Sequence, residues 1–227
     1  MGKITIFLAL AALLTAAAAG AGTDELRTRI GQEYGLDHWD DVEELRYTFN
    51  VRSGEREVRR SWVWRVKRRT VTFRDDIAGG EAVTYSLDDI GETTAEELKK
   101  IDHRFINDQY WLLFALHVAW DTSAEVTAAD GEPLPIGEGT ATKVTVQYPE
   151  EGGYTPGDAY DVFVNADGRV VQWVFRQGGQ PEPSLATTWE DQREFGPLVI
   201  PTKFRSPDGS FELWFSDVQV ITLDAID

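Results

Sequence analysis

The titratable and nucleophilic side chains of this sequence form none of the compact motifs on which catalysis commonly depends. The chain has no cysteine, and none of its serines lies in a G-x-S-x-G turn, so neither a thiol nor an elbow-type serine nucleophile is indicated. The three histidines, His38, His103 and His117, lack the H-x-x-x-H spacing that places two imidazoles on one helix face for zinc. We therefore expect no catalytic residue, no metal site and no cofactor.

Two of these histidines have neighbours that suggest a role. His103 follows Asp102, and a general base is often oriented by a carboxylate. Adjacent residues on a helix point to different faces, however, so we do not expect this pair to act together. His117 interrupts an apolar stretch, where a buried, hydrogen-bonded histidine is the favoured interpretation.

Pairs of acidic residues are the remaining candidates for acid–base chemistry. They occur at Asp40-Asp41, Asp75-Asp76, Asp88-Asp89 and Glu190-Asp191. A glycosidase places two carboxylates across a sugar, and tryptophan-rich surfaces favour sugars, so a carbohydrate-active enzyme is one alternative function. This alternative requires two carboxylates to face each other in a cleft beside exposed tryptophan.

Large apolar side chains, above all aromatic ones, are the remaining candidates for a functional site. Many of them fall on the inward faces of predicted strands or on a central apolar run, and as a set they would line a space with apolar walls. Such a space is a natural site for an acyl chain. Core packing uses the same residue types, so a protein-docking domain without a ligand is a further alternative. The candidate ligand-binding residues are Phe49, Trp62, Trp64, Trp111, Phe114, Val146, Trp173, Phe175 and Trp189.

The stretch 105–121 is the element that would position these side chains. Between residues 110 and 120 only His117 interrupts a run of apolar and aromatic residues, and the run is shorter than the roughly 20 residues that span a bilayer. Residues 94–97 have the pattern of a capping box, and helical spacing follows. We predict a helix, or two helices broken near residues 107–108, that forms a plug inside a sheet.

Residues on both sides of this run alternate between apolar and polar, which is typical of half-buried β-strands. An amphipathic helix is predicted at residues 23–34, and a loop at residues 122–141, which are rich in Gly, Pro, Thr and acids. The fold class predicted is mainly β (α+β): a curved antiparallel half-barrel sheet wrapped around a helical plug or lid. The alternating segments before the run are 45–52, 58–66, 71–73 and 83–87, and those after it are 143–148, 160–165, 170–176, 198–204, 211–215 and 218–223.

The N-terminus has the order of a secretory signal peptide. Lys3 is followed by an apolar segment at residues 4–14 and by Ala19-Gly20-Ala21, a plausible cleavage site. We expect residues 1–21 to be the signal peptide and residues 22–227 to form a single domain. The protein would then be exported, periplasmic or secreted and monomeric, without a membrane span once the signal is removed, and without a lipid anchor because there is no cysteine.

The distribution of charge limits the possible partners. The net charge of −17 argues against nucleic acid, because binding to phosphates needs an excess of Lys and Arg. Nine of the 22 basic residues nevertheless lie between Arg52 and Arg74. They form either a patch for an anionic headgroup or partner, or a solvated outer face paired with acidic neighbours. The second interpretation is favoured in a chain this acidic.

Three segments of the second half carry a resemblance to a known family. They are YDVFVNADGRVVQWVF, TTWEDQREFGPLVIPTKF and FSDVQV, and their succession of strand, turn, strand, aromatic-acid step and closing strands resembles the lipoprotein-carrier (LolA-like) half-barrel superfamily. That group includes periplasmic lipoprotein carriers, envelope-stress sensors (RseB-like) and mycobacterial lipid-binding lipoproteins (LppX-like). The first half of this chain matches only in the order of its elements.

This resemblance implies an open half-barrel with a helical lid and a hydrophobic cavity for lipid or acyl groups, and no catalytic residues. It also implies envelope lipid or lipoprotein handling, with envelope proteins as candidate partners. The absence of cysteine departs from the anchored mycobacterial relatives. The best likeness is to members whose ligands are not known.

Overall fold

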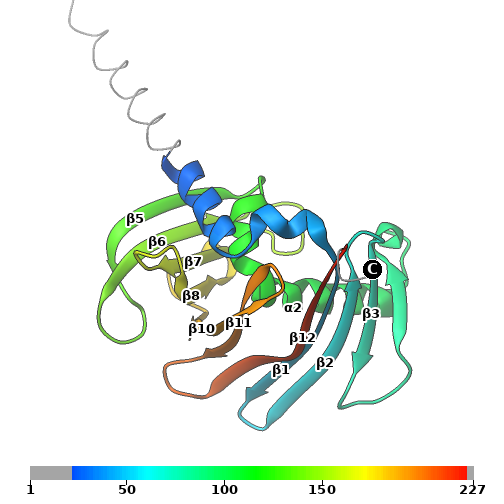
Figure 1. Cartoon of the computed structure of the whole chain (residues 1–227). Coiled ribbons are helices and arrows are strands. Elements are labelled where there is room, and N and C mark those ends of the chain that lie inside the picture. The colour runs from blue at the N-terminus through cyan, green and yellow to red at the C-terminus, as the bar shows by residue number, and fades with distance from the viewer. Residues whose placement is uncertain (1–21, 224–227) are drawn as a thin grey trace, which may run out of the picture.

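Two antiparallel β-sheets and one long helix make up most of the fold (Figure 1). The computed structural model describes residues 22–223. The predicted signal peptide, residues 1–21, lies outside the described residues.

The larger sheet joins strands from the two ends of the described chain. The last strand pairs antiparallel with the first, which places Phe215 opposite Phe49 and Val220 opposite Leu45. Apolar residues at every second position of the first strand, such as Leu45, Tyr47 and Phe49, are buried on the inner face. The strand order is β10 (Glu190–Phe195), β11 (Leu198–Arg205), β12 (Phe211–Thr222), β1 (Val42–Ser53), β2 (Arg56–Arg65), β3 (Thr70–Asp75) and β4 (Val83–Ser86).

The smaller sheet is a simple meander in which each strand pairs with the next. Its central strand is buried along its whole length, whereas the first is largely exposed. The strand order is β5 (Glu125–Pro133), β6 (Thr140–Gln147), β7 (Ala159–Val164), β8 (Val170–Arg176) and β9 (Leu185–Thr188).

The two sheets meet at Trp189, the single residue between β9 and β10. The Thr188 hydroxyl accepts a hydrogen bond from the backbone N–H of Arg205 (3.1 Å), which ties the end of β9 to β11. The Trp189 side chain is buried, and its ring packs at 4.6 Å from that of Phe204. The chain thus passes from β9 of the small sheet directly into β10 of the large sheet. The two sheets together form an open, curved surface with β4 and β5 at its outer edges.

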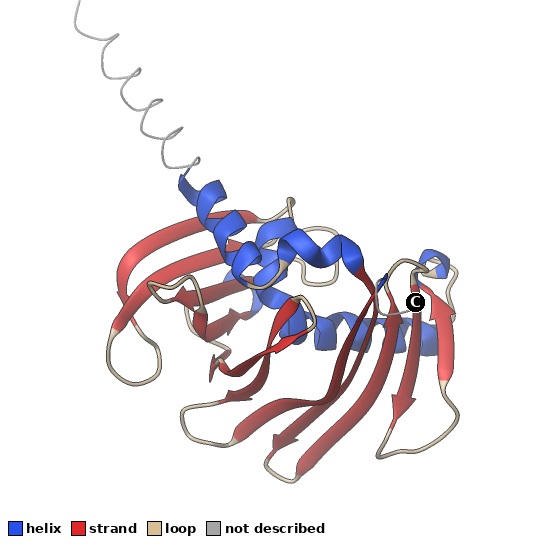
Figure 2. Ribbon diagram, in the orientation of Figure 1, coloured by secondary structure: helices blue, strands red, loops and turns tan. Residues whose placement is uncertain are grey.

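Helix α2 (Glu96–Trp120) crosses between the two sheets (Figure 2). Phe105 packs against Trp62 of the large sheet (5.5 Å between ring centroids), and Phe114 packs against Tyr160 of the small sheet (5.0 Å). Each apolar side chain that is fully buried in this way contributes about 1.5–3 kcal/mol. The predicted half-barrel with a helical plug is therefore confirmed: the fold is mainly β and antiparallel, with two open sheets.

The start of α2 differs from the predicted one, and of the two forms predicted for its course, the helix that is unbroken at residues 107–108 is present. The N-cap is Ala95 and makes no side-chain bond, because Thr94 instead donates to Asp89 O (3.0 Å) and accepts from Gly91 N (2.8 Å) in the preceding turn. The helix does not break at residues 107–108 but departs from helical geometry at Leu113 (φ −123°, ψ 16°). Asp108 is helical, and its carboxylate accepts from Arg60 and Trp62 on the neighbouring strand β2.

The prediction of a loop at residues 122–141 is wrong. Most of β5 (Glu125–Pro133) and the start of β6 (Thr140–Gln147) lie there. Strand β5 is at the edge of its sheet and pairs only with β6. Its side chains are mostly exposed, so it lacks the apolar alternation that reveals a half-buried strand.

The predicted N-terminal amphipathic helix is present at residues 22–33, followed by the 3₁₀ helix η1 (Leu36–Asp41). Ile30 of this helix is fully buried. The guanidinium of Arg27 donates to the carbonyls of Val118 (2.9 Å) and Asp121 (3.0 Å), which satisfies acceptors at the C-terminal end of α2. Two shorter 3₁₀ helices are η2 (Leu87–Asp89) and η3 (Gln177–Gly179). Between residues 22 and 223, no helix is long and apolar enough to cross a membrane.

We expect Phe114→Ala to destabilise the fold by about 3–5 kcal/mol, because the substitution leaves a cavity where α2 contacts the small sheet. Arg104→Ala, at an exposed position of the same helix, should change the free energy of unfolding by less than about 0.5 kcal/mol. Urea unfolding followed by circular dichroism measures both. Equal, small effects of the two substitutions would contradict the assignment of α2 as the centre of the core.

Candidate ligand-binding cleft

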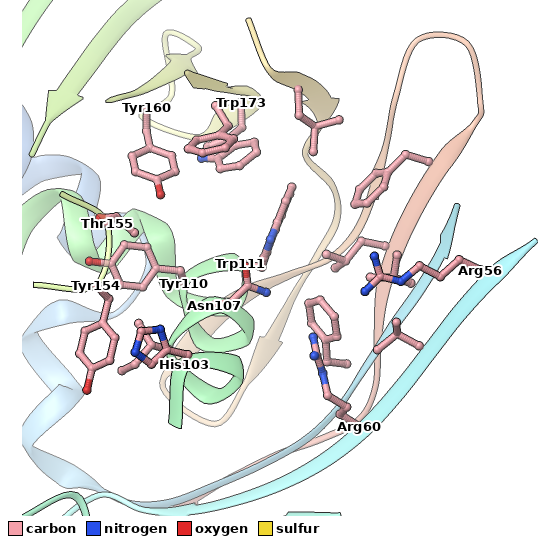
Figure 3. Close-up of a pocket in the computed structure, with 18 residues that line it drawn as sticks. Arg56, Arg60, His103, Asn107, Tyr110, Trp111, Tyr154, Thr155, Tyr160 and Trp173 are labelled. Atoms are coloured by element: carbon pink, nitrogen blue, oxygen red, sulfur yellow. The ribbon is translucent and has the colours of Figure 1, made fainter. Parts of the chain in front are cut away.

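A cleft of about 490 Å³ lies between the two sheets, along one side of α2 (Figure 3). Strands β1, β2 and β12 form one wall, and β7, β8 and β9 form the other. The helix and the loop at residues 149–158 complete the lining. The volume lies within the range of about 300–1,000 Å³ that is usual for small-molecule sites.

Aromatic and aliphatic side chains dominate the lining of this cleft. The polar lining residues are two arginines, one histidine, one asparagine and one threonine, and the described part of the chain contributes no carboxylate to the lining. That composition contrasts with a chain that has 39 acidic and 22 basic residues. The apolar lining residues are Phe49, Val51, Val58, Ile106, Tyr110, Trp111, Tyr154, Tyr160, Trp173, Phe175, Leu185, Phe211 and Leu213.

Arg60 is the more buried of the two arginines. One of its terminal nitrogens donates to Asp108 Oδ1 (2.6 Å), and its guanidinium lies 4.7 Å from the centre of the Phe49 ring. The other carboxylate oxygen of Asp108 accepts from Trp62 Nε1 (2.8 Å). Burial raises the pKa of Asp108 to about 6, although the charge of Arg60 and hydrogen bonds from Asn107, Trp62 and Arg60 oppose this rise. The positive charge of Arg60 is thus already paired inside the protein.

Arg56 is placed differently. It begins β2, it is exposed, and its side chain extends into the cleft from the same wall as Arg60 (Figure 3). Within residues 22–223, Arg56 has neither an ion pair nor a side-chain hydrogen bond, whereas Arg60 has both. The cleft therefore contains one guanidinium group whose charge is not compensated by the protein.

Asp102 of α2 fixes the position of the loop that forms the other end of the lining. This carboxylate is fully buried and accepts from Tyr85 (3.0 Å) and Tyr154 (2.6 Å), which attaches the loop at residues 149–158 to the helix. His103 faces the cleft with its ring 5.3 Å from that of Tyr154. As expected for adjacent helical residues, His103 and Asp102 point to different surroundings and make no hydrogen bond with each other.

The structure brings together four of the nine candidate residues at this cleft: Phe49, Trp111, Trp173 and Phe175. The other five lie in packed parts of the molecule. Trp62 and Trp64 pack against Phe105, between β2 and α2. The remaining three are buried on α2, on β6 and at the junction of the sheets: Phe114, Val146 and Trp189. The alternation of side chains along a strand identifies its inner face, but it does not say which part of that face the helix covers.

Sequence reasoning missed the two arginines, because all nine basic residues of this region were considered together. The alternation along β2 does indicate that these two arginines face inward. Successive residues of one face are two positions apart, and this face carries Arg56, Val58, Arg60 and Trp62. For most of the others the favoured interpretation is confirmed by ion pairs with acidic neighbours. These pairs are Arg52 with Glu212, Arg65 with Glu44, Lys67 with Asp40, Arg69 with Asp88 and Arg74 with Asp76.

The prediction for His117 is also confirmed. It is buried, its Nε2 lies 3.0 Å from Gln109 Oε1, and its Nδ1 lies 3.0 Å from Asp121 Oδ2. Asp121 also accepts from the hydroxyl of Tyr148 (2.5 Å). Although burial acts to raise the pKa of Asp121, hydrogen bonds from its neighbours and the charge of His117 lower it overall. This network fastens the last turn of α2 to the small sheet.

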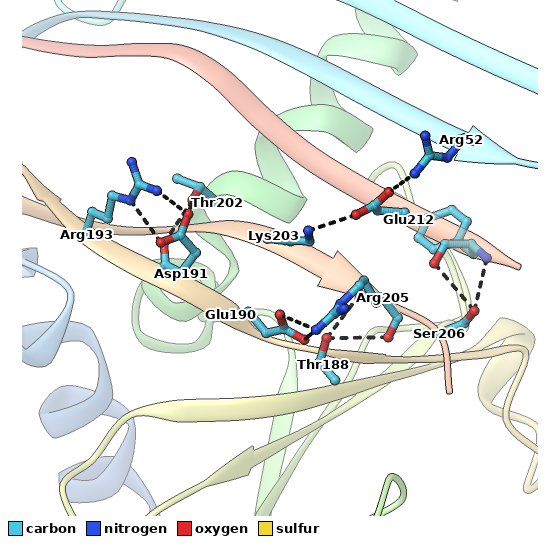
Figure 4. Close-up of polar contacts among 11 residues, drawn as sticks. Arg52, Thr188, Glu190, Asp191, Arg193, Thr202, Lys203, Arg205, Ser206 and Glu212 are labelled. Carbon is cyan, nitrogen blue, oxygen red and sulfur yellow. Dashed lines mark hydrogen bonds and ion pairs between the residues drawn. The ribbon is translucent and has the colours of Figure 1, made fainter. Parts of the chain in front are cut away.

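The paired acids lie away from the cleft. Glu190 and Asp191 are on the opposite face of the large sheet, where Arg205 (2.8 Å) and Arg193 (2.5 Å) bind their carboxylates (Figure 4). The hydrogen bonds from Arg193 and Thr202 lower the pKa of Asp191. The other three pairs also contribute to surface ion pairs, through Asp40, Asp76 and Asp88. Between residues 22 and 223, no group of three or more His, Asp or Glu side chains converges as metal ligands would.

Neither a protein-family model nor a curated protein matches the chain. Among solved structures, the chain is similar to a DUF1329 family protein from Desulfovibrio piger, with 9% sequence identity and a TM-score of 0.47. The similarity covers 88% of this chain and 92% of that protein. At this level of identity and superposition, no property of that protein is transferred to this one.

We expect Arg60→Met to destabilise the fold more at pH 8 than at pH 5. The raised pKa of Asp108 means that, between about pH 4 and pH 6, the folded state retains a proton that the unfolded state has released, so stability falls as pH rises through that window. Without Arg60 this pKa rises further. The cost at pH 8 should be about 3 kcal/mol or more, and smaller at pH 5, where Asp108 is protonated.

Urea unfolding at the two pH values measures this difference. Arg59→Met is the matched control, because Arg59 is exposed on the opposite face of β2. A cost of Arg60→Met that is the same at pH 5 and pH 8 would show that Arg60 does not neutralise Asp108.

Proposed function

We propose that this protein binds a lipid or another hydrophobic ligand in the cleft between the two sheets, and that it catalyses no reaction. The observation that carries the proposal is an apolar cleft of about 490 Å³ that neither the helix nor the sheets fill. Each buried methylene of a ligand contributes about 0.8 kcal/mol, so a long chain needs few polar contacts to bind well.

The size of the cleft favours one chain over two. Its volume of about 490 Å³ lies in the lower half of the range of about 300–1,000 Å³ that is usual for sites holding one small ligand. The second chain of a phospholipid would have to lie outside the lining described above. A single acyl chain is therefore the ligand that the space supports best.

The two alternative functions are less well supported. A glycosidase needs two carboxylates across its substrate, and the part of the chain that the structure describes places none in the lining of this cleft. A pure docking domain would have its concavity filled by side chains, and here part of the space stays open. Export and a role in envelope lipid or lipoprotein handling belong to the same proposal, and they rest on the N-terminal segment and on the resemblance in the second half.

Mass spectrometry under native conditions, on protein purified from its own envelope, tests the proposal directly. We expect a bound mass that solvent extraction releases as a lipid. Protein that is free of any such mass, and whose melting temperature and tryptophan fluorescence do not respond to added palmitate, would show that the cleft is not a lipid site. The fluorescence reports on the cleft because Trp111 and Trp173 line it.

A cleft-filling substitution locates the ligand. Val58→Trp places a large ring in the cleft, and we expect it to weaken palmitate binding by at least about tenfold, a change of about 1.4 kcal/mol. Val63→Trp adds the same ring on the opposite face of β2 and should leave binding unchanged. Isothermal titration measures both affinities, and equal affinities would place the ligand elsewhere.

A further inference from the structure

We propose that the ligand is a single-chain amphiphile with an anionic group at one end, and that Arg56 forms the ion pair with this group. The inference rests on the proposed function and specifies its ligand. It starts from the charge of the lining, which contains two guanidinium groups and no carboxylate among the described residues, in a chain with a net charge of −17.

The two arginines differ in what they can offer a ligand. Asp108 holds Arg60 through a short ion pair, and Phe49 covers one side of its guanidinium. A ligand anion at Arg60 would have to compete with a buried carboxylate. Arg56 has no counter-charge within residues 22–223 and remains exposed, so its five N–H donors are available.

A neutral hydrophobic ligand would fit this cleft poorly at Arg56. Such a ligand would remove water from the guanidinium without supplying an acceptor, and an unpaired charge is costly to desolvate. An arginine does not escape this cost by losing its proton, because the guanidinium group stays charged in proteins. A carboxylate or a phosphate would instead gain a charge-assisted hydrogen bond, and both accept from arginine in bidentate geometry.

The geometry also gives the ligand a direction. Arg56 projects from β2, whereas Trp173 and Tyr160 lie on the opposite wall, with Trp111 of α2 between them (Figure 3). The anionic end would lie at the start of β2, next to solvent, and the chain would run across α2 toward the aromatic side chains of the small sheet. A polyanion is disfavoured here because the acidic protein repels it over a long range, whereas a ligand with one charge is repelled far less.

Four ligands of matched chain length separate the possibilities: palmitate, hexadecyl phosphate, hexadecanol and the cationic hexadecylamine. We expect the wild-type protein to bind the two anions at least about tenfold more tightly than the alcohol, as expected for one charge-assisted hydrogen bond. Arg56→Gln should remove this preference, because it weakens the binding of the anions and does not weaken that of the alcohol. The preference should also shrink when the salt concentration rises, because Arg56 is exposed.

The matched control is Arg59→Gln, which removes the same charge three residues away on the opposite face of β2 and should change none of the affinities. Arg56→Glu should weaken palmitate binding further and strengthen the binding of hexadecylamine. Circular dichroism verifies that the variants fold, and neither arginine has an ion pair in the described structure that its replacement would break.

The outcomes distinguish this inference from the proposed function. If the wild-type protein binds none of the four ligands, the proposed function itself is wrong. If it binds the alcohol as tightly as the anions, or if Arg56→Gln keeps the preference for anions, the cleft binds hydrophobic chains but Arg56 does not select an anion. Tighter binding of hexadecyl phosphate than of palmitate supports the inference with a phosphate group, and the reverse order supports it with a carboxylate.

Discussion

The burial of helix α2 is the constraint on which the rest of the structure depends. Its second half is apolar almost all round, and residues Trp111 to Val118 are buried without exception. Such a helix is stable in water only when other elements cover nearly every side of it. One flat sheet covers one side, so the chain supplies two sheets and bends the strand path at Trp189 to bring them around the helix.

The same helix carries polar groups into the core, and their partners fix how it sits. Asp102 is bonded by two tyrosines, Asp108 by Arg60 and Trp62, and His117 by Gln109 and Asp121. An unpaired polar group at any of these positions would be costly. A rotation or sliding of the helix would break several of these bonds at once, whereas apolar contacts alone would tolerate such movement. The polar contacts thus hold α2 in one register, and this register determines where the cleft lies.

The sequence predicts those parts of the fold that follow from local periodicity. Alternation identifies strands such as β1 because one of their faces is buried and the other is not, and the same reasoning explains why the exposed edge strand β5 was missed. The site is harder to predict because it depends on tertiary coverage. Trp62 and Trp173 have the same pattern in the sequence, and α2 packs on both, yet only Trp173 also lines the open cleft.

The arginines of β2 show how the fold and the site are connected. At two inward positions, one on each side of Val58, this strand has a cation where a core strand would have an apolar residue. Arg60 lies close enough to α2 to be neutralised by Asp108, and it therefore contributes to the position of the helix. Arg56 lies four residues nearer the start of the strand, and it makes no ion pair with any carboxylate of α2 that the structure describes. In the same strand, Arg60 thus forms a structural ion pair beneath the helix. Arg56, where the coverage by the helix ends, is an unpaired charge at the opening of an apolar space.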